Sequence, residues 1–465
     1  MIKKVFNNKV VKAGSWYTFT ELFLKGITFL TIPIFTRLLS TVDYGIVSLY
    51  TTWVSIFTII IGLNLNTSIT KAKYDFRDEY DSFVSSIIFL SLVIFLGYII
   101  IFTTLGSKIQ SISGFSGFLF YFMIFQSYFS FIRTSLIAKL RVEYKYKKIS
   151  IISILINIIG VITSIALIIY LFEDKTYIGK ILGNGIFIII SGLFFLIYLL
   201  KSGSGKLINK NYWKYALVLS IPLIFHSLSG IINAQFDRII INKYVGESAT
   251  GLYSFAYNIG MIMTVLTYAL DQAWSPYVYE TMETGNINDL KIKGKIYRDF
   301  YTLAYAILLL LSPEIIRIIA DEAYWESLVI IPYIFAGYYF SYMYTLEVKT
   351  EFFYRKTNLI SVGTLFSAII NIILNIAFVP RFGYVAAAAT TTVSYLFLFV
   401  FHYFITSKVI KKSVYGLNFH IQSLLFMVSI TMYYIIFVDN LIMRITGILM
   451  ILALGYWSLV KKMVK

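Results

Sequence analysis

Residues 16–36 read WYTFTELFLKGITFLTIPIFT, a run with the length and apolarity of one membrane-spanning α-helix. Glu21 and Lys25 lie inside this run, one helical turn apart and near the middle of the bilayer. Burying charge at that depth costs free energy. The pair therefore predicts that the protein encloses something polar or anionic within the membrane. The alternative is that the two charges neutralise each other and only stabilise packing.

The remainder of the chain is built from similar apolar runs. Of its 465 residues, 58% are hydrophobic and 14% are charged, whereas a soluble domain has roughly 25% charged residues. This composition predicts an all-α polytopic membrane protein. We expect about fourteen transmembrane helices, near residues 16–36, 45–68, 83–104, 115–137, 149–171, 177–199, 221–242, 251–274, 299–320, 328–348, 359–379, 384–406, 419–437 and 441–459. The polar stretches between them, roughly 25 residues at most, are too short to form a soluble domain.

Several classes of protein are excluded by what the chain lacks. It has no cysteine, which excludes disulfides, thiolate catalysis and cysteine-based metal sites. Its three histidines, His226, His402 and His420, are far apart in the sequence and have no metal-ligand spacing. No phosphate-binding loop of the Walker type and no nucleophile–base arrangement is present. We therefore expect neither an enzyme nor a resident metal or cofactor, and leave coupling to a sodium or proton gradient open.

The basic residues predict the orientation of the chain. Roughly 29 of the 40 Lys and Arg residues fall in the N-terminal arm, in alternate loops and at the C-terminus, which the positive-inside rule places in the cytoplasm. Lys139, Arg298 and Lys349 are counted among these loop residues. Both termini are thus predicted to be cytoplasmic, and the first span is expected to stay uncleaved. The same rule explains the net charge of +17 without a nucleic-acid partner.

The chain resembles itself at an offset of about 206 residues. The matches are Gly45 with Gly251, Ser48 with Ser254, residues 146–148 with residues 354–356, and Gly179 with Gly383. An offset of six spans keeps both copies the same way up, which is a parallel repeat with an axis along the membrane normal. We therefore predict an N-lobe at residues 1–208, a C-lobe at 209–415, two further helices at 416–465, and alternating access to a site between the lobes. Chance similarity between apolar segments is the alternative.

Other charged residues lie within or at the ends of predicted spans. Asp237 and Arg238 are adjacent in the seventh span, where their side chains diverge by about 100°, so each is expected to have its own partners. Arg133 in the fourth span is either a cavity residue or an arginine that reaches the interface. Asp271 ends the eighth span as a helix-end residue or a gate residue. Glu347 in the tenth span is expected to be interfacial, with ion coupling as the alternative.

Several motifs together resemble the Wzx-type polysaccharide flippases. The first part is Lys25-Gly26, Pro33 to Ser40 and Asp43-Tyr44-Gly45. The second part is Asp237 to Ile241, Gly251 to Ser254, Gln272 to Pro276 and the run from Gly383 to Thr391. The similarity extends over essentially the whole chain. It implies the multidrug/oligosaccharidyl-lipid/polysaccharide (MOP, MATE-like) exporter superfamily, in which two six-helix lobes surround a central cavity.

The resemblance also implies a substrate and a set of site residues. Wzx-type members move undecaprenyl-pyrophosphate-linked oligosaccharide repeat units to the outer leaflet of the bacterial inner membrane, for O-antigen, lipopolysaccharide or capsule synthesis, alongside polymerase and chain-length proteins. Their cavities are cationic, and four residues of this chain fit that description: Lys25, Arg37, Arg133 and Arg238. An interfacial anchor is the alternative for Arg37. Three carboxylates would serve as charge partners or in ion coupling: Glu21, Asp237 and Asp271.

Three other functions remain open at this point. A flippase for lipid-linked peptidoglycan precursor has the same span count. A cation-coupled multidrug exporter has the same fold, but its cavity should be acidic and aromatic, and the basic residues in the spans count against it. A membrane-embedded polymerase or glycosyltransferase needs a large outer loop with catalytic residues, and every outer loop here is short.

Overall fold

The computed structural model describes residues 9–104, 106–203, 205 and 207–463. Every element within these residues is a helix. The chain divides into two compact units, one of Met1–Thr31 and Ile46–Phe236 (unit 1) and one of Ile32–Gly45 and Asp237–Lys465 (unit 2). The predicted lobes, divided after residue 208, are a different partition and stay a prediction.

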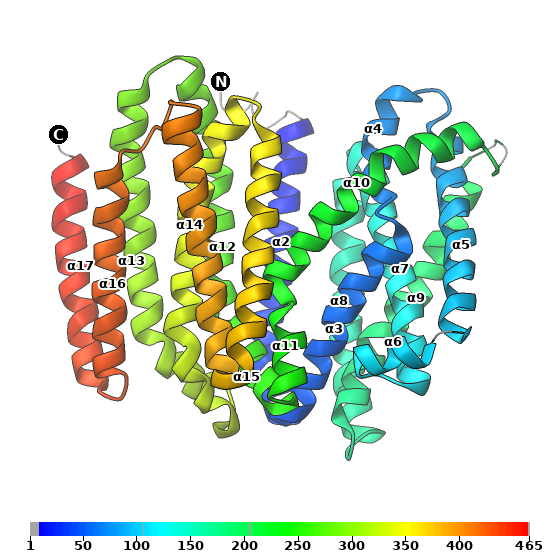
Figure 1. Ribbon diagram of the computed structural model, residues 1–465, viewed down its shortest axis with the longest axis horizontal. Coiled ribbons are helices and arrows are strands. Elements are labelled where there is room, and N and C mark those ends of the chain that lie inside the picture. Colours follow the sequence, from blue (N-terminus) through cyan, green and yellow to red (C-terminus); the bar gives the residue numbers. More distant parts are fainter. Residues whose placement is uncertain (1–8, 105, 204, 206, 464–465) are drawn as a thin grey trace. The chain divides into compact units, whose positions relative to one another are not determined.

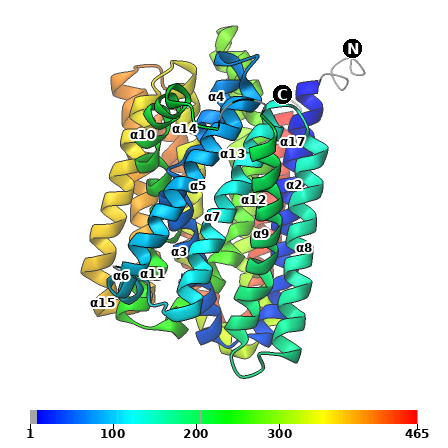
Figure 2. The ribbon, with the colours of Figure 1, turned by 90° about the vertical axis from the view of Figure 1, so that its right-hand side faces the viewer.

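Unit 1 takes in most of α2 and α3 and the seven helices that follow them. Its helices are α2 (Lys9–Leu38), α3 (Thr41–Gly62), α4 (Asn66–Asp75), α5 (Tyr80–Thr104), α6 (Gly106–Ser113), α7 (Gly117–Val142), α8 (Tyr146–Tyr170), α9 (Thr176–Lys201) and α10 (Lys210–Gln235). The helices α8 and α9 run side by side (Figure 2). Small residues explain how closely these two helices approach, since a Cβ on Gly183 would lie 2.4 Å from the Cα of Ser164.

Unit 2 holds the remaining helices. They are α11 (Asp237–Tyr244), α12 (Glu247–Glu283), α13 (Ile287–Ile319), the 3₁₀ helix η1 (Glu322–Ile330), α14 (Ile331–Phe353), α15 (Thr357–Phe404), the π-helical turn η2 (Ile405–Val409), α16 (Leu417–Phe437) and α17 (Leu441–Met463). Within this unit, α13, α16 and α17 pack side by side (Figure 1). Its core is unusually aromatic: Tyr301 and Tyr342 stack with their ring centroids 3.6 Å apart, and both are buried.

The prediction of an all-α polytopic membrane protein is confirmed. Among the described residues, ten helices are long and apolar enough to cross a membrane, or eleven if α6 and α7, bent by 88° at their junction, form one span. Every predicted span coincides with a helix, including α14 and α17, which are not among these ten or eleven. The predicted number of fourteen spans is therefore approximate. One boundary differs from the prediction, because the seventh span begins earlier, at Lys210, and breaks after Gln235. The eleventh and twelfth spans are the two arms of α15, which meet at the kink at Gly383 (φ 66°) and are joined by hydrogen bonds from Ser367 to Ser394 and from Asn371 to Thr391.

A reciprocal contact in unit 2 joins the two glycines that the repeat pairs. A Cβ on Gly45 would lie 1.9 Å from the carbonyl oxygen of Glu247, and a Cβ on Gly251 would lie 1.9 Å from that of Thr41. Each glycine thus faces the carbonyl four residues before the other glycine. Such exchange of equivalent contacts is the expected signature of a local two-fold axis. It supports the predicted repeat at this place.

A second pair of repeat positions needs a correction of register. The turns after α7 and α14 have the same hydrogen bonds and one residue each with positive φ, Tyr144 at 55° and Arg355 at 59°. The structural equivalent of residues 143–145 is therefore 354–356, three residues away from the alignment of 146–148 predicted from sequence. The match of Gly179 with Gly383 was also wrong, because Gly179 packs against Ile168 inside a helix whereas Gly383 forms a kink.

Candidate functional site

A buried carboxylate opens the helix α11. Asp237 is 1% exposed and lies at the N-terminus of the helix, where the backbone dipole favours negative charge. Tyr253 Oη donates to its Oδ2, Thr391 Oγ1 donates to the same oxygen at 2.7 Å, and Asn375 Nδ2 donates to Oδ1 at 2.8 Å. These donors come from α12 and from both arms of α15. A buried carboxylate needs several such donors to offset its lost hydration.

Further oxygens surround this carboxylate. Asn371 Nδ2 donates to Thr391 Oγ1 at 2.9 Å, which holds the Asn371 amide beside the same cluster. The Oδ1 atoms of Asn371 and Asn375 are buried and have no hydrogen-bond partner in the described part of the chain. Carboxylate, amide and hydroxyl oxygens are the ligands of hard cations. No group of three or more His, Cys, Asp or Glu side chains suited to a metal ion occurs among the described residues.

Arg238 points to different partners from those of Asp237. Its Nε donates to Ser254 Oγ at 3.1 Å, and its guanidinium carbon lies 5.7 Å from the ring centroid of Tyr257. The prediction that the two adjacent charges have separate partners is therefore confirmed. Ser254 is one of the residues singled out by the internal repeat, which is the signal by which sequence could have found it.

Asp271 has a partner that sequence reasoning missed. It forms an ion pair with Lys349 of α14 and accepts a hydrogen bond from Ser275 Oγ at 2.9 Å. Lys349 is only 4% exposed, so its assignment to a cytoplasmic loop was wrong. Lys139 and Arg298 were assigned wrongly in the same way, because both are buried in helices, where they pair with Asp81 and Asp299 respectively. Their position at the ends of apolar runs made them look like loop residues.

The remaining candidate cations are less enclosed. In unit 1, Glu21 is exposed and Lys25 is half-buried on α2. Arg133 is half-buried on α7, and its Nε is buried without a hydrogen-bond partner among the described residues. In unit 2, Arg37 is exposed and donates from Nη1 to the carbonyl of Pro33 at 3.1 Å, at the C-terminus of its own helix. That contact agrees with the anchor alternative for Arg37, while the substrate roles of all four cations stay predictions.

Two carboxylates on α14 belong to a buried polar cluster that sequence reasoning did not find. Glu347 is fully buried among protein side chains, while its expected position at the membrane interface stays a prediction. It lies 2.8 Å from His420 Nε2, and Glu351, one turn later, lies 2.6 Å from His402 Nδ1. The histidines are on α16 and α15, and only knowledge of which helices are neighbours could have paired them with α14.

Comparison with known proteins adds the family. The family model described as polysaccharide biosynthesis protein matches residues 10–282, which is more than half of the chain. A protein of the Lsg locus of Haemophilus influenzae is 27% identical over 434 residues, covering 88% of this chain and 99% of that protein. An uncharacterised membrane protein of the same organism is 26% identical over 293 residues, covering 60% of this chain and 67% of that protein.

Solved structures show which fold the chain shares. The lipid II flippase MurJ in an inward closed conformation matches with a TM-score of 0.72 and 16% identity, covering 96% of this chain and 99% of that one. An inward-facing multidrug resistance MATE transporter of the MOP superfamily matches with a TM-score of 0.57 and 15% identity, covering 84% and 96%. At these identities the likeness establishes a fold of the MOP exporters. The chain is thus a multi-pass membrane protein with a transporter fold.

Proposed function

The chain belongs to the polysaccharide biosynthesis protein family, and we propose that it flips undecaprenyl-pyrophosphate-linked oligosaccharide repeat units from the cytoplasmic to the outer leaflet of the bacterial inner membrane. The observation that carries this proposal is the family match over residues 10–282, in a chain whose fold is that of a lipid-linked precursor flippase. Surface-polysaccharide synthesis, with a polymerase and chain-length proteins as partners, is the cellular setting. The basic loops favour an orientation with both termini in the cytoplasm.

Cationic side chains would lower the free-energy cost of moving the pyrophosphate across the membrane. Moving bare charge through hydrocarbon costs several kcal/mol or more, whereas arginine offers a planar pair of donors that matches phosphate oxygens. The Nε of Arg133, which has no hydrogen-bond partner among the described residues, supports a role for that residue, since a guanidinium inside a span otherwise has partners. Lys25, Arg37 and Arg238 complete the proposed set. The polyprenyl tail stays in lipid throughout.

Energy would come from a cation gradient that acts through Asp237. The two Asn oxygens without donors support a bound cation there, because buried amide oxygens are normally satisfied. Sodium is favoured by the oxygen-only ligands, and a proton on the carboxylate is the alternative. Asp271 and Glu21 are weaker candidates, since Lys349 already neutralises Asp271 and Glu21 is exposed. A flipping rate that is unchanged when both gradients are collapsed would refute this part of the proposal.

One rival is favoured by a specific observation. The fold likeness to the lipid II flippase keeps a peptidoglycan-precursor substrate as the second candidate. The two functions differ in their genetics. Loss of the only peptidoglycan-precursor flippase stops wall synthesis and lyses the cells, whereas loss of a repeat-unit flippase leaves the wall intact.

Deletion of the gene tests the proposed function directly. We expect lipid-linked repeat units to accumulate in the cytoplasmic leaflet, where a membrane-impermeant lectin added to intact spheroplasts does not reach them. Lectin binding should return when the gene is restored, and lysed spheroplasts serve as the control for total lipid-linked sugar. Normal surface polysaccharide in a deletion strain without a second flippase would contradict the proposal.

A further inference from the structure

Two buried carboxylate–histidine pairs lie together on one helix of unit 2. Glu347 and Glu351 occupy successive turns of α14, and both are 0% exposed. Glu347 Oε1 is 2.8 Å from His420 Nε2, and Glu351 Oε1 is 2.6 Å from His402 Nδ1. Both histidine side chains are at most 2% exposed. Four ionisable side chains in one water-poor site point to a function, because each is costly to bury.

The surroundings of the pairs support this interpretation. Thr406 Oγ1 donates to Glu347 Oε2 at 2.5 Å, and Thr406 lies in the π-helical turn η2, a distortion found frequently at functional sites. Room for His402 depends on a glycine, because a Cβ on Gly363 would lie 2.5 Å from His402 Nε2. Three polar atoms of the cluster are buried without a hydrogen-bond partner in the described ranges: Glu351 Oε2, His402 Nε2 and His420 Nδ1.

The neighbouring charges do not neutralise the two glutamates. Lys349, between them on α14, pairs with Asp271 of α12, and Arg298 of α13 pairs with Asp299 and donates to the carbonyl of Phe419 at 2.8 Å. The other titratable groups that face the pairs are phenols. These are Tyr344, with its ring 4.8 Å from that of His402, and Tyr403 and Tyr415, with rings 5.1 and 6.3 Å from that of His420. The histidines are therefore the groups placed to compensate both carboxylates.

The hydrogen-bond pattern identifies the atoms that would take protons. An ionised carboxylate can only accept, so the ring nitrogen that faces it carries the hydrogen. The other ring nitrogen of each neutral histidine then keeps its lone pair. These are His420 Nδ1 and His402 Nε2, the two ring nitrogens of the cluster that have no hydrogen-bond partner among the described residues. A proton taken up at either nitrogen changes its Glu–His pair from one net negative charge to none, which is the cheaper state in a low-dielectric site.

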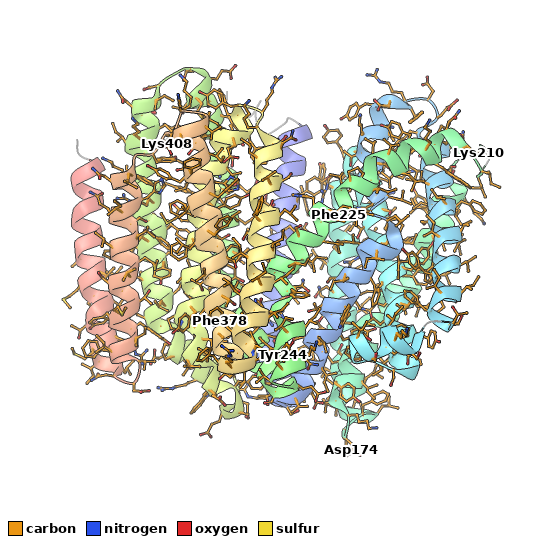
Figure 3. All side chains as sticks on the ribbon, viewed as in Figure 1. Asp174, Lys210, Phe225, Tyr244, Phe378 and Lys408 are labelled. Atoms are coloured by element: carbon orange, nitrogen blue, oxygen red, sulfur yellow. The ribbon has the colours of Figure 1, made fainter. Side chains whose placement is uncertain are left out.

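We propose that Glu347–His420 and Glu351–His402 form a proton-binding site whose loading and release couple a proton gradient to the transport cycle. The coupling step rests on the proposed flippase function, while proton binding does not. The site is separate from the Asp237 cluster of the same unit. Lys408 of η2 marks the end of unit 2 near the histidine pairs, and Tyr244, the last residue of α11, lies at the opposite end (Figure 3). A sodium ion at Asp237 and protons at the histidines could therefore be bound independently.

Proton binding can be measured on the purified full-length chain, because it has only three histidines. Ring ¹³C–¹H NMR signals of ¹³C-labelled histidine are followed from about pH 5 to about pH 8, the range in which histidine changes charge. We expect the ring signals of His402 and His420 to change between the two ends of this series, because each neutral imidazole takes up a proton. His226, exposed on α10, serves as the reference within the same chain and is identified by the His226→Gln variant. If His402 and His420 keep one protonation state across this range, the proposal is overturned.

Two variants then test the pairing. Glu347→Gln should change the titration of His420 and leave His226 unchanged, while Glu351→Gln should do the same for His402. The exposed carboxylate Glu283, changed to Gln, is the matched control and should alter neither signal. If Glu283→Gln changed the titration of either histidine as much as Glu347→Gln does, the specific pairing of Glu347 with His420 would be contradicted. The wild-type titration decides the proposal if a glutamate variant does not fold.

The coupling step is tested in proteoliposomes with a fluorescent short-chain polyprenyl-pyrophosphate disaccharide as the probe. An imposed pH gradient should accelerate flipping several-fold in wild type and in His226→Gln, and this acceleration should be lost when His402 and His420 are both changed to Gln. If the flipping rate of the wild type does not change when the pH gradient is imposed, the coupling step is overturned. Absence of any flipping refutes the proposed function instead, and the NMR titration still decides whether the site binds protons.

Discussion

Unit 1 and unit 2 hold their intramembrane charges in different ways. In unit 2, Asp237, Glu347 and Glu351 are fully buried, and each forms a hydrogen bond with a side chain of another helix. In unit 1, Glu21 is exposed, Lys25 is half-buried, and Arg133 has a buried Nε without a described partner. Buried carboxylates with several donors hold small ions or stabilise the fold, whereas a less enclosed cation such as Arg133 can reach a larger anion.

The difference suggests a division of labour. Unit 2 contains buried acidic clusters that can hold a cation or a proton, together with Arg37 and Arg238 of the proposed substrate set. Unit 1 contains the other two proposed cations, Lys25 and Arg133. On this hypothesis, changes in unit 2 should affect stability and ion coupling first. Changes in unit 1 should affect transport while the protein remains folded.

Asp237→Leu should have the largest effect on stability. It removes the acceptor of Tyr253, Thr391 and Asn375, and each buried donor left unpaired costs about 1–3 kcal/mol. We expect a total loss of about 3–5 kcal/mol, as for other broken buried charge networks, measured by thermal unfolding in detergent. Asp237→Asn keeps one acceptor and should lose less. Glu283→Leu, at an exposed carboxylate of α12, should change stability by at most about 0.5 kcal/mol.

Gly251→Ala should be the next most damaging. The new Cβ would meet the backbone carbonyl of Thr41 at 1.9 Å, so the first turn of α3, which belongs to unit 2, and α12 must move apart. Overpacking of this kind costs about 1–3 kcal/mol. Gly230→Ala in unit 1 is the matched control, because no described atom outside its own stretch of helix backbone lies within 4 Å of its Cβ position. Since alanine favours a helix over glycine by about 1 kcal/mol, a more stable Gly251→Ala protein would show that the reciprocal glycine contact is looser than described.

Sequence predicted the fold well because the bilayer imposes a local rule. Each predicted span is a helix because some 20 apolar residues in a row satisfy their own backbone hydrogen bonds in lipid. Part of the internal repeat was also visible in the sequence, because the close helix contact requires glycine at both Gly45 and Gly251. An error arose where a predicted span is interrupted: the seventh span breaks after Gln235, so that α10 belongs to unit 1 and α11 to unit 2.

The candidate sites were less predictable, for the reason that they depend on which helices are neighbours. Asp237 was noticed because a charge inside an apolar run stands out, but its amide partners Asn371 and Asn375 did not. Lys349 looked like a loop lysine until α12 supplied Asp271. His402 and His420 are 18 residues apart in sequence and meet the same helix only through the packing of α14 against α15 and α16. No local pattern encodes such contacts.

Arg133→Leu separates function from stability in unit 1. Its guanidinium has a buried nitrogen without a described partner, so replacing it with an apolar side chain should change stability by less than about 1 kcal/mol. Flipping of the fluorescent probe should fall by about tenfold, equivalent to about 1.4 kcal/mol of lost interaction. Arg141→Leu, at an exposed arginine on the same helix, should keep both properties. A large loss of stability in Arg133→Leu would show that this arginine has a structural role and would remove the main contrast between the units.

Lys25→Ala should have the smallest effect and bears on the charge pair in the first span. Lys25 is half-buried and Glu21 is close enough in sequence to screen it, so we expect a loss of roughly threefold in flipping, about 0.7 kcal/mol. Lys25→Arg should restore the rate, because it returns the positive charge. Lys201→Ala, at an exposed lysine that ends α9, is the control for loss of charge alone. If Lys25→Ala lowers the amount of protein in the membrane and leaves the rate per molecule unchanged, the pair stabilises packing and unit 1 contributes Arg133 alone to the proposed substrate path.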